Sequence, residues 1–375
     1  MKKQKVAHIL MSVGGLIVSV KLISEHLNSD LYESVIIHDN NEVSYKDNKG
    51  SLIRSFTVPF IRAINPIKDL ITLIKVYKII KAEKPDLIHC HSAKAGIIGR
   101  IIGKLTNVPT LYTPQAFSFL SSNSNLKRRI FLAIEKLCKF NNSLLLACSN
   151  SEYKRGVEEV NYKQHQVRLW NNSLPPAKEV NGQPSINIPK QYICALSRPS
   201  YQKNVEMLIE VMKILQPLLP ELKLLIVGAG YHSPNKKSVE TLIEKYNLSQ
   251  NIILIPWIER TEALKIIKNA DCVVSSSRYE GLPFAIIEAL SLAKACVVTK
   301  VDGNQDLINN AVNGYTVELD DVKDMSEKIH TIITDPSLRT SFEQKSFTIF
   351  NEKFNINNTV TQLEEIYSSH INSGL

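Results

Sequence analysis

The chain alternates short apolar segments with longer amphipathic ones over most of its length. The short segments are rich in Val, Ile and Leu, as strands buried on both faces are. The longer segments repeat apolar residues every three or four positions, which is typical of helices packed on a sheet. This alternation predicts an α/β fold in which helices cover both faces of parallel sheets.

The expected elements follow from these periods. Strands are predicted at 6–11, 34–38, 87–90, 110–112, 143–148, 192–196, 223–227, 252–255, 272–275 and 295–299. Helices are predicted at 16–28, 66–83, 95–105, 126–140, 204–216, 238–246, 261–267, 284–292, 322–333 and 355–370.

The pattern breaks at 171–190, where four prolines stand among Asn, Gly and Ser, as in a linker. At roughly 150 residues per domain, 375 residues suit two or three domains. We therefore expect a doubly wound, Rossmann-like domain at 1–180 and a second at 190–350. The two would face each other across a cleft, and the last helix would pack back on the first domain.

Composition excludes several classes of protein. Hydrophobic residues make up 44% of the chain, too many for a disordered one. Apolar runs fall well short of the roughly 20 residues of a membrane-spanning helix. The six cysteines are scattered without a CxxC pair, which indicates buried thiols in a reducing compartment. The basic, then apolar, amino end resembles a signal peptide, but it runs directly into helical spacing, so we expect a cytoplasmic protein.

The net charge of +9 is unevenly distributed. Residues 1–185 hold 26 Lys and Arg against 14 Asp and Glu, a net of +12, while residues 186–375 have a net of −3. A basic first half indicates an anionic partner for that domain alone. Nucleic acid, an anionic membrane and a phosphorylated substrate are the candidates. Nucleic acid is the weakest, because the basic residues are not interleaved with aromatics in any known module.

Candidate chemistry gathers in the second half. Arg198 and Lys203 follow a predicted strand and precede a helix, where a guanidinium fork and an ammonium suit a diphosphate. A solvated loop is the alternative. Gly228 begins a Gly-x-Gly after the next strand, which is weak evidence alone. Trp257 and Ile258 follow a third strand, where Trp257 would flank a base or belong to the core.

Two glutamates frame the last part of this pattern. Glu280 precedes Gly281, Leu282 and Pro283, and a helix begins near Phe284. The free N–H groups and the dipole of that helix start favour a phosphate. Glu288 lies farther along the helix among apolar residues, where a carboxylate needs hydrogen-bond donors such as ribose hydroxyls. The alternative for Glu288 is a partly exposed helix glutamate.

Glu280 and Glu288, with the Gly-Leu-Pro between them and Arg198 and Lys203 upstream, resemble the retaining glycosyltransferases of family 4, which have the GT-B fold. The resemblance extends over nearly the whole chain. Its further matches are Gly14-Gly15, Pro85-Asp-Leu-Ile-His89-Cys-His91, Ser149 and Gly303–Asp306, where Asp306 replaces the family's Glu.

The resemblance implies a role for each motif. Arg198 and Lys203 would bind the donor diphosphate, Glu288 the ribose and Glu280 the transferred sugar. Backbone N–H groups at 281–284 would meet sugar and phosphate, and Gly14 and Gly15 would line the opposite wall. The family needs no metal, and the chain has no Asp-x-Asp strand exit. A UDP-sugar is the favoured donor, with no other cofactor.

Two positions of the first half bear on mechanism. Gln115 stands where many relatives have His, and because Gln does not titrate it would not act as an acid or base. We expect it to donate to a sugar or phosphate, and the donor's own phosphate to take the acceptor proton. His89 and His91 form a His-x-His, but no third ligand is in view, so we expect no metal site.

The sequence thus predicts a metal-independent hexosyl- or N-acetylhexosaminyltransferase. Its acceptor would be a lipid-linked saccharide for a surface polysaccharide, at the inner face of the plasma membrane. A nucleotide-sugar 2-epimerase of the same fold is one alternative, and it would release product without an acceptor. A non-enzymatic protein that binds anionic lipid or nucleic acid is another, and its binding would survive Arg198→Ala and Glu288→Ala.

Overall fold

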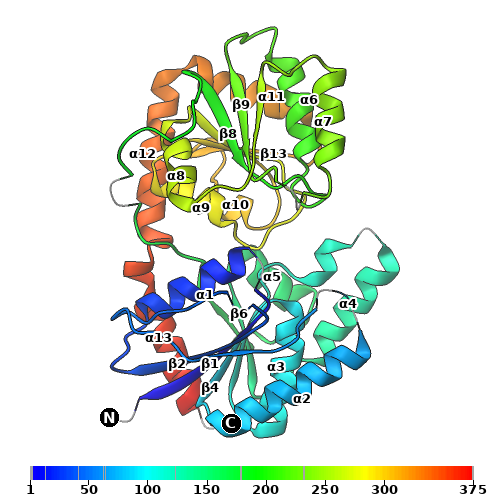
Figure 1. Cartoon of the computed structure of the whole chain (residues 1–375), viewed down its shortest axis with the longest axis vertical. Coiled ribbons are helices and arrows are strands. Elements are labelled where there is room, and N and C mark those ends of the chain that lie inside the picture. The colour runs from blue at the N-terminus through cyan, green and yellow to red at the C-terminus, as the bar shows by residue number, and fades with distance from the viewer. Residues whose placement is uncertain are drawn as a thin grey trace. The chain divides into compact units, whose positions relative to one another are not determined.

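The computed structural model describes residues 3–12, 14–40, 42–61, 63, 65–122, 124–177, 180–230 and 233–373. The chain forms two compact units, Met1–Ser173 with Ile356–Leu375 (unit 1) and Leu174–Asn355 (unit 2). The boundary between Ser173 and Leu174 lies within the 171–190 segment, and the rest of that segment, with its four prolines, belongs to unit 2. Each unit is a parallel sheet between helices (Figure 1).

Unit 1 has a seven-stranded sheet in the order β3-β2-β1-β4-β5-β6-β7. Its strands are β1 (Gln4–Leu10), β2 (Tyr32–His38), β3 (Ser55–Thr57), β4 (Leu87–His91), β5 (Thr110–Thr113), β6 (Ser143–Ala147) and β7 (Val167–Leu169). Its helices are α1 (Gly15–His26), α2 (Pro66–Glu83), α3 (Ala93–Thr106), α4 (Asn125–Leu137), α5 (Asn150–Glu158) and α13 (Ile356–Asn372), with short 3-10 turns at Ser118–Ser121 and Gln164–Gln166.

Unit 2 has a six-stranded sheet in the order β10-β9-β8-β11-β12-β13. Its strands are β8 (Tyr192–Leu196), β9 (Lys223–Val227), β10 (Ile252–Ile255), β11 (Cys272–Ser275), β12 (Cys296–Thr299) and β13 (Gly314–Val317). Its helices are α6 (Val205–Leu215), α7 (Lys236–Lys245), α8 (Arg260–Asn269), α9 (Phe284–Ser291), α10 (Asn304–Leu307), α11 (Val322–Thr334) and α12 (Pro336–Lys353).

Both sheets are doubly wound, because the strand order reverses beside the first strand of each unit. In unit 1 the reversal lies between β1 and β4, and in unit 2 between β8 and β11. All pairings between these described strands are parallel. Ligands of such sheets bind beyond the carboxyl ends of the strands at the reversal point, so this edge is where a site is expected in each unit.

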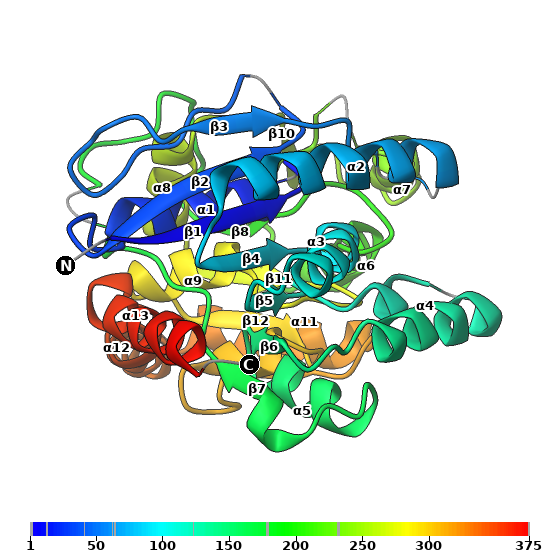
Figure 2. The same cartoon turned by 90° about the horizontal axis from the view of Figure 1, so that it is seen from below.

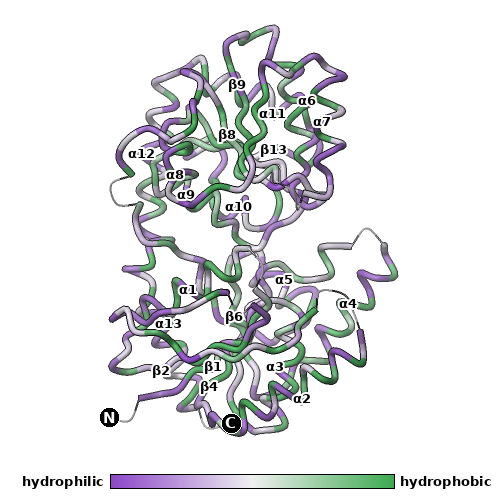
Figure 3. Tube along the Cα trace, in the orientation of Figure 1, coloured by the Kyte–Doolittle hydropathy of each residue, from purple (hydrophilic) through white to green (hydrophobic). Residues whose placement is uncertain are grey.

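The strands form the apolar centre of each unit, and the tube in Figure 3 is mostly hydrophobic along them. In unit 1, Ile9, Ile88 and Cys90 face one way, into a core with Ile98 and Ile102 of α3. The alternate residues of β1 and β4 therefore face the opposite side of the sheet. All six cysteines are buried and free, as their scattered positions predicted.

The carboxyl-terminal helix α13 belongs to unit 1 although it follows unit 2 in sequence. The Trp170 indole donates to the Thr359 carbonyl at 2.9 Å, and the Tyr32 hydroxyl donates to the Glu364 carbonyl at 2.9 Å. Farther along, the Tyr367 hydroxyl lies 2.7 Å from Nδ1 of His89. These polar contacts tie α13 to the sheet through strand residues and the end of β7.

Three helices and three strands were not expected from the sequence: α5, α10, α12, β3, β7 and β13. Helix α5 buries small or polar residues, Ser151, Glu152 and Gly156, so it has no apolar stripe. Helix α12 buries Phe342, Ser346 and Phe350 at every fourth position, and the serine interrupts the stripe. Strands β3 and β7 have three residues each, too few for periodicity to register.

Candidate functional site

The carboxyl ends of the unit 2 strands gather most of the residues singled out in the sequence. Arg198 follows β8, Gly228 follows β9, Trp257 follows β10 and Glu280 follows β11. Strands β8 and β11 are neighbours at the reversal point, which brings Lys203 and Glu280 together across 77 positions of sequence. The candidate site therefore lies on the edge where doubly wound sheets bind ligands.

Lys203 and Glu280 form an ion pair rather than two separate groups. The Lys203 ammonium donates to Oε1 of Glu280 at 2.6 Å, and the Ser277 hydroxyl donates to the same oxygen at 2.7 Å. Glu280 is buried, and its Oε2 accepts from the Gln202 amide at 3.4 Å. Three donors thus hold this carboxylate in a fixed position at the strand end. The sequence pointed to Lys203 and Glu280 but gave them separate ligands, and it missed Ser277.

Arg198 is the cation at this edge that remains open. It is exposed, and among the described residues it has no hydrogen bond or ion pair. Its backbone N lies 3.5 Å from where a Cβ on Gly228 would be, so the two strand ends touch through backbone. A free guanidinium next to a bare glycine turn suits a phosphate group.

The loop from Gly281 to Pro283 leads into α9, whose Pro283 caps the first turn without a side-chain hydrogen bond. Gly281, Leu282 and Pro283 are buried and Phe284 is partly buried. This loop packs against Gly303, which has φ of 76°. A Cβ on Gly303 would lie 2.5 Å from the Gly281 carbonyl oxygen, so only glycine allows this approach.

Glu288 lies one turn into α9 and is buried. Oε1 accepts from Nε of Arg260, the first residue of α8, at 2.7 Å. Burial raises the pKa of the Glu288 carboxyl, and the charge and hydrogen bond of Arg260 partly offset that rise. The alternative of a partly exposed helix glutamate is wrong. Arg260 was missed because it belongs to no motif of the sequence.

Trp257 does not belong to the core, the alternative left open by the sequence. The residue is 74% exposed beyond the end of β10, with Ile258 partly buried beside it. Its backbone N lies 3.6 Å from where a Cβ on Gly230 would be. An exposed indole that neighbours a glycine turn is available to stack on a planar ligand.

Unit 1 carries the remaining predicted residues at the ends of β1 and β5. Gly14 precedes α1 with φ of 49°, and both Gly14 and Gly15 are exposed. Gln115 follows β5, and its amide exchanges two hydrogen bonds of 2.8 Å with the buried Asn172 amide. Nε2 of Gln115 also donates to the Ser19 hydroxyl at 3.4 Å, whereas Oε1 keeps a second lone pair that a ligand hydroxyl can use without breaking the Asn172 pair.

Asn172 and Glu152 had no signal in the sequence. Glu152 accepts from the Ala116 N–H at 2.9 Å and from the Cys148 N–H at 2.8 Å, which joins the ends of β5 and β6. Gln115 and Ala116 both have positive φ, a backbone conformation that residues other than glycine rarely adopt. The Glu152 carboxylate therefore stabilises a strained turn.

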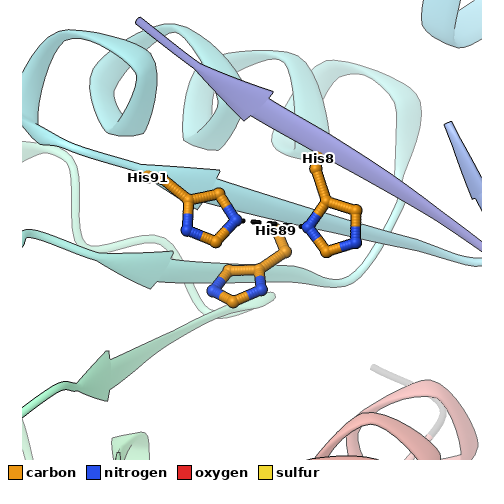
Figure 4. Close-up of side chains that lie close together, drawn as sticks. All are labelled: His8, His89 and His91. Carbon is orange, nitrogen blue, oxygen red and sulfur yellow. Dashed lines mark hydrogen bonds between the residues drawn. The ribbon is translucent and has the colours of Figure 1, made fainter. Parts of the chain in front are cut away.

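Three histidines form the one candidate metal cluster among the described residues (Figure 4). His8 of β1 joins His89 and His91 of β4, and Nδ1 of His8 lies 3.2 Å from Nε2 of His91. The sequence expectation that no third ligand was in view is wrong, because parallel register places His8 directly beside His89. The sequence did contain a signal for this ligand, because His8 stands in the first predicted strand, and Leu10, two positions later, pairs with His91.

The cluster suits neutral imidazoles better than a metal dication. All three rings are buried, and burial lowers their pKa values, that of His8 to about 3. No carboxylate belongs to the cluster in the described part of the chain, so the charge of a dication would be uncompensated. Nε2 of His8 and Nδ1 of His91 have no partner among the described residues, and a metal on the facing nitrogens would leave both as buried N–H donors.

No helix in the described ranges combines the length and the hydropathy that crossing a bilayer requires.

Comparison with known proteins adds the family. The model described as Glycosyltransferase Family 4 matches residues 13–178, and the model described as Glycosyl transferases group 1 matches residues 178–348.

The chain is also similar to individual proteins. It is 29% identical over 332 residues to a UDP-Gal:alpha-D-GlcNAc-diphosphoundecaprenol alpha-1,3-galactosyltransferase of Escherichia coli, with 84% of each chain covered. It is 25% identical over 393 residues to the capsular polysaccharide biosynthesis glycosyltransferase CapM of Staphylococcus aureus, covering 99% of this chain and 98% of CapM.

Solved structures agree on the fold. Sucrose-phosphate synthase of Thermosynechococcus elongatus superposes with a TM-score of 0.84 at 20% identity, over 98% of this chain and 99% of that one. Since the two family models match in chain order and the doubly wound units are those of this fold, the chain belongs to glycosyltransferase family 4 and has the GT-B fold.

Proposed function

We propose that the protein is a retaining transferase that moves a hexosyl or N-acetylhexosaminyl group from a nucleoside diphosphate sugar, most favourably a UDP-sugar, to a lipid-linked saccharide. The observation that carries the proposal is the set of charged side chains at the strand ends of unit 2. A free guanidinium, a lysine–glutamate pair and a buried glutamate lie on the ligand-binding edge of that sheet.

Each of these groups has a part of the donor to bind. Arg198 and Lys203 would neutralise the diphosphate, and the first turn of α9 would add its N–H groups and dipole. Oε2 of Glu280 would accept from a hydroxyl of the transferred sugar, since Oε1 is used by Lys203 and Ser277. Glu288 would accept from the ribose hydroxyls, with Trp257 and Ile258 next to the base.

The chemistry would need no metal in this scheme. Cations and a helix start stabilise the charge that develops on the leaving diphosphate. We name no side-chain nucleophile, because the buried carboxylate at the strand end is already held by three donors. The donor's phosphate would take the proton of the acceptor hydroxyl on the face that the phosphate leaves.

The acceptor assignment rests on similarity and on charge. The Escherichia coli relative is named for an acceptor with a diphosphoundecaprenol carrier, and the Staphylococcus aureus relative for capsular polysaccharide biosynthesis. A lipid-linked diphosphate is anionic and lies at a membrane surface. The net charge of +12 over residues 1–185 would favour both the carrier and the surface.

Two helices of unit 1 have exposed apolar side chains next to basic ones, and we call these side chains the α2/α4 face. On α2 the exposed apolar residues are Ile67, Leu70, Ile71 and Ile74, at helical spacing, and Lys68, Lys75 and Lys78 are exposed beside them. On α4 they are Leu126, Ile130 and Leu137, with Lys127, Arg128, Arg129 and Lys136. Both helices lie on the side of unit 1 away from α13 (Figure 1, Figure 2). Apolar side chains flanked by cations suit the interface of an anionic bilayer.

The donor half of the proposal is tested by calorimetry against a panel of UDP-, GDP- and ADP-sugars. Binding of one of them in the micromolar range, lost in Arg198→Ala, is expected. If none binds to the purified protein, the donor assignment is wrong. An assay without any acceptor then separates transfer from epimerisation, because an epimerase would convert the nucleotide sugar by itself.

The membrane half is tested by sedimentation with phosphatidylglycerol and phosphatidylcholine vesicles. We expect salt-sensitive binding to phosphatidylglycerol alone, weakened in a Leu70→Ser, Leu137→Ser variant. Leu218→Ser is the matched control, since Leu218 is also exposed but lies in unit 2. Equal loss in the control, or no loss in the double variant, would show that the α2/α4 face is not the docking surface.

A further inference from the structure

Arg260 contacts Glu288 at the candidate donor site, and neither the motifs nor the family resemblance assigns it a role. It is the first residue of α8 and is 45% exposed through its side chain, whereas the Glu288 side chain is 11% exposed. Only Nε donates to Glu288, at 2.7 Å, so the guanidinium meets the carboxylate through one hydrogen bond and not as a fork.

The single bond leaves polar atoms open on both partners. Oε2 of Glu288 and the two terminal nitrogens of Arg260 have no hydrogen-bond partner among the described residues. Oε2 is also absent from the buried polar atoms without a partner, so solvent reaches it. The pair therefore presents one acceptor and two donor groups toward whatever ligand occupies this edge.

We propose that Arg260 is a positioning residue of the donor site, which holds Oε1 of Glu288 by its Nε and leaves Oε2 to accept a ribose hydroxyl. The proposal rests on the proposed function and deepens it. A carboxylate this buried in an apolar helix is costly as an anion. Arg260 compensates the charge from the solvent side, so Glu288 can accept rather than donate hydrogen bonds at neutral pH.

The opposite role is physically possible and gives the opposite result. Arg260 could occupy the place of the ribose, so that a nucleotide must break the pair before it binds. Removal of Arg260 would then tighten binding, because the ligand would no longer compete with the guanidinium. The one-point geometry favours positioning, since a competitor would be expected to use both carboxylate oxygens.

Charge gives the positioning role its own signature. Burial raises the pKa of the Glu288 carboxyl and Arg260 lowers it. Without Arg260 the carboxyl would gain its proton at a higher pH, and a protonated carboxyl is a poorer acceptor. Binding by the variant should therefore weaken further as the pH falls, whereas a residue that only shapes the loop would weaken binding equally at every pH.

The experiment is calorimetric titration of the full-length protein with UDP, or with the nucleoside diphosphate that binds best, at about pH 5.5, 6.5 and 7.5. The variants are Arg260→Ala, Arg260→Lys and the control Lys265→Ala. Lys265 lies on the same helix and bonds Glu262, not Glu288. Each dissociation constant is divided by the wild-type value at the same pH, which removes the titration of the phosphates.

We expect Arg260→Ala to weaken binding about tenfold or more at pH 7.5, and further at pH 5.5. Arg260→Lys should keep a flat ratio across pH, because it retains the charge, and Lys265→Ala should match the wild type. Unchanged or tighter binding by Arg260→Ala would overturn the proposal. Absence of any nucleotide binding by the folded wild type would overturn the proposed function first, and this proposal with it.

Discussion

Acidification should destabilise unit 1 selectively, because three histidines are buried there as neutral rings. His8, His89 and His91 all have pKa values lowered by burial, that of His8 from 6.5 to about 3. At a pH between its folded-state and unfolded-state pKa values, such a group is neutral in the folded protein and binds a proton when the protein unfolds. The free energy of unfolding must then fall as the pH drops below about 6.5.

The magnitude follows from the slope for one proton, about 1.4 kcal/mol per pH unit. Between pH 6.5 and 5, His8 alone removes about 2 kcal/mol, and His89 and His91 add to this loss in the same direction. That is a large share of the 5–15 kcal/mol that typically stabilise a domain. His38 and His370 of unit 1 also have lowered pKa values and act in the same direction. Carboxylates with lowered pKa values, such as Asp30, lose their contribution only near pH 4 and below.

The two tryptophans allow unit 1 to be observed by itself. Trp170 is buried in unit 1, whereas Trp257 of unit 2 is already exposed in the folded state. Urea unfolding followed by tryptophan fluorescence at about pH 7.5, 6.5, 5.5 and 5 therefore reports mainly on unit 1. We expect His8→Gln to reduce the pH slope by about one proton, that is by about 2 kcal/mol at pH 5. The exposed His165→Gln serves as control, and a wild-type free energy that stays flat from pH 7.5 to 5 would refute the reasoning.

Three further changes test other parts of the structure. Gly303→Ala should lower both the nucleotide affinity and the melting temperature, because its Cβ would clash with the Gly281 carbonyl and its φ is positive; calorimetry that finds wild-type affinity would contradict this. Arg100→Met should cost unit 1 about 3–5 kcal/mol in urea unfolding, since it strands the buried Glu135 carboxylate that accepts from Arg100 at 2.8 Å, and Glu135→Leu in the same chain should restore part of that loss. EDTA should leave sugar transfer unchanged, and abolished turnover that added zinc or magnesium restores would make the metal-independent scheme wrong.

The sequence was most informative for elements whose buried residues follow one regular period. Strands β8, β9, β10 and β11 and helix α2 were predicted with the bounds that the structure has, because each is a clean apolar or amphipathic run. It failed where burial uses small or polar side chains, as in α5, and where an element is as short as β3. Such elements form because of contacts with distant parts of the chain, and the local period of apolar residues does not indicate those contacts.

The site shows the same division. Motif residues such as Glu280 and Glu288 were found, because their chemistry is unusual for their local surroundings. Their partners were not, since Ser277 and Arg260 have ordinary local contexts and gain meaning only from the folding of distant strand ends onto one edge. His8 stands in the first predicted strand, but it was missed because its place beside His89 and its contact with His91 depend on the register of β1 against β4.

The central claim is that unit 2 binds a nucleoside diphosphate with Glu288 on its ribose. The most direct measurement compares UDP with 2′,3′-dideoxy-UDP by calorimetry, for the wild type and for Glu288→Ala. The wild type should bind the dideoxy compound about tenfold or more weakly, because a charged acceptor loses its hydroxyl donors, and Glu288→Ala should bind both compounds about equally. If Glu288→Ala still discriminates between them as strongly as the wild type does, Glu288 does not hold the ribose and the account of this site is wrong.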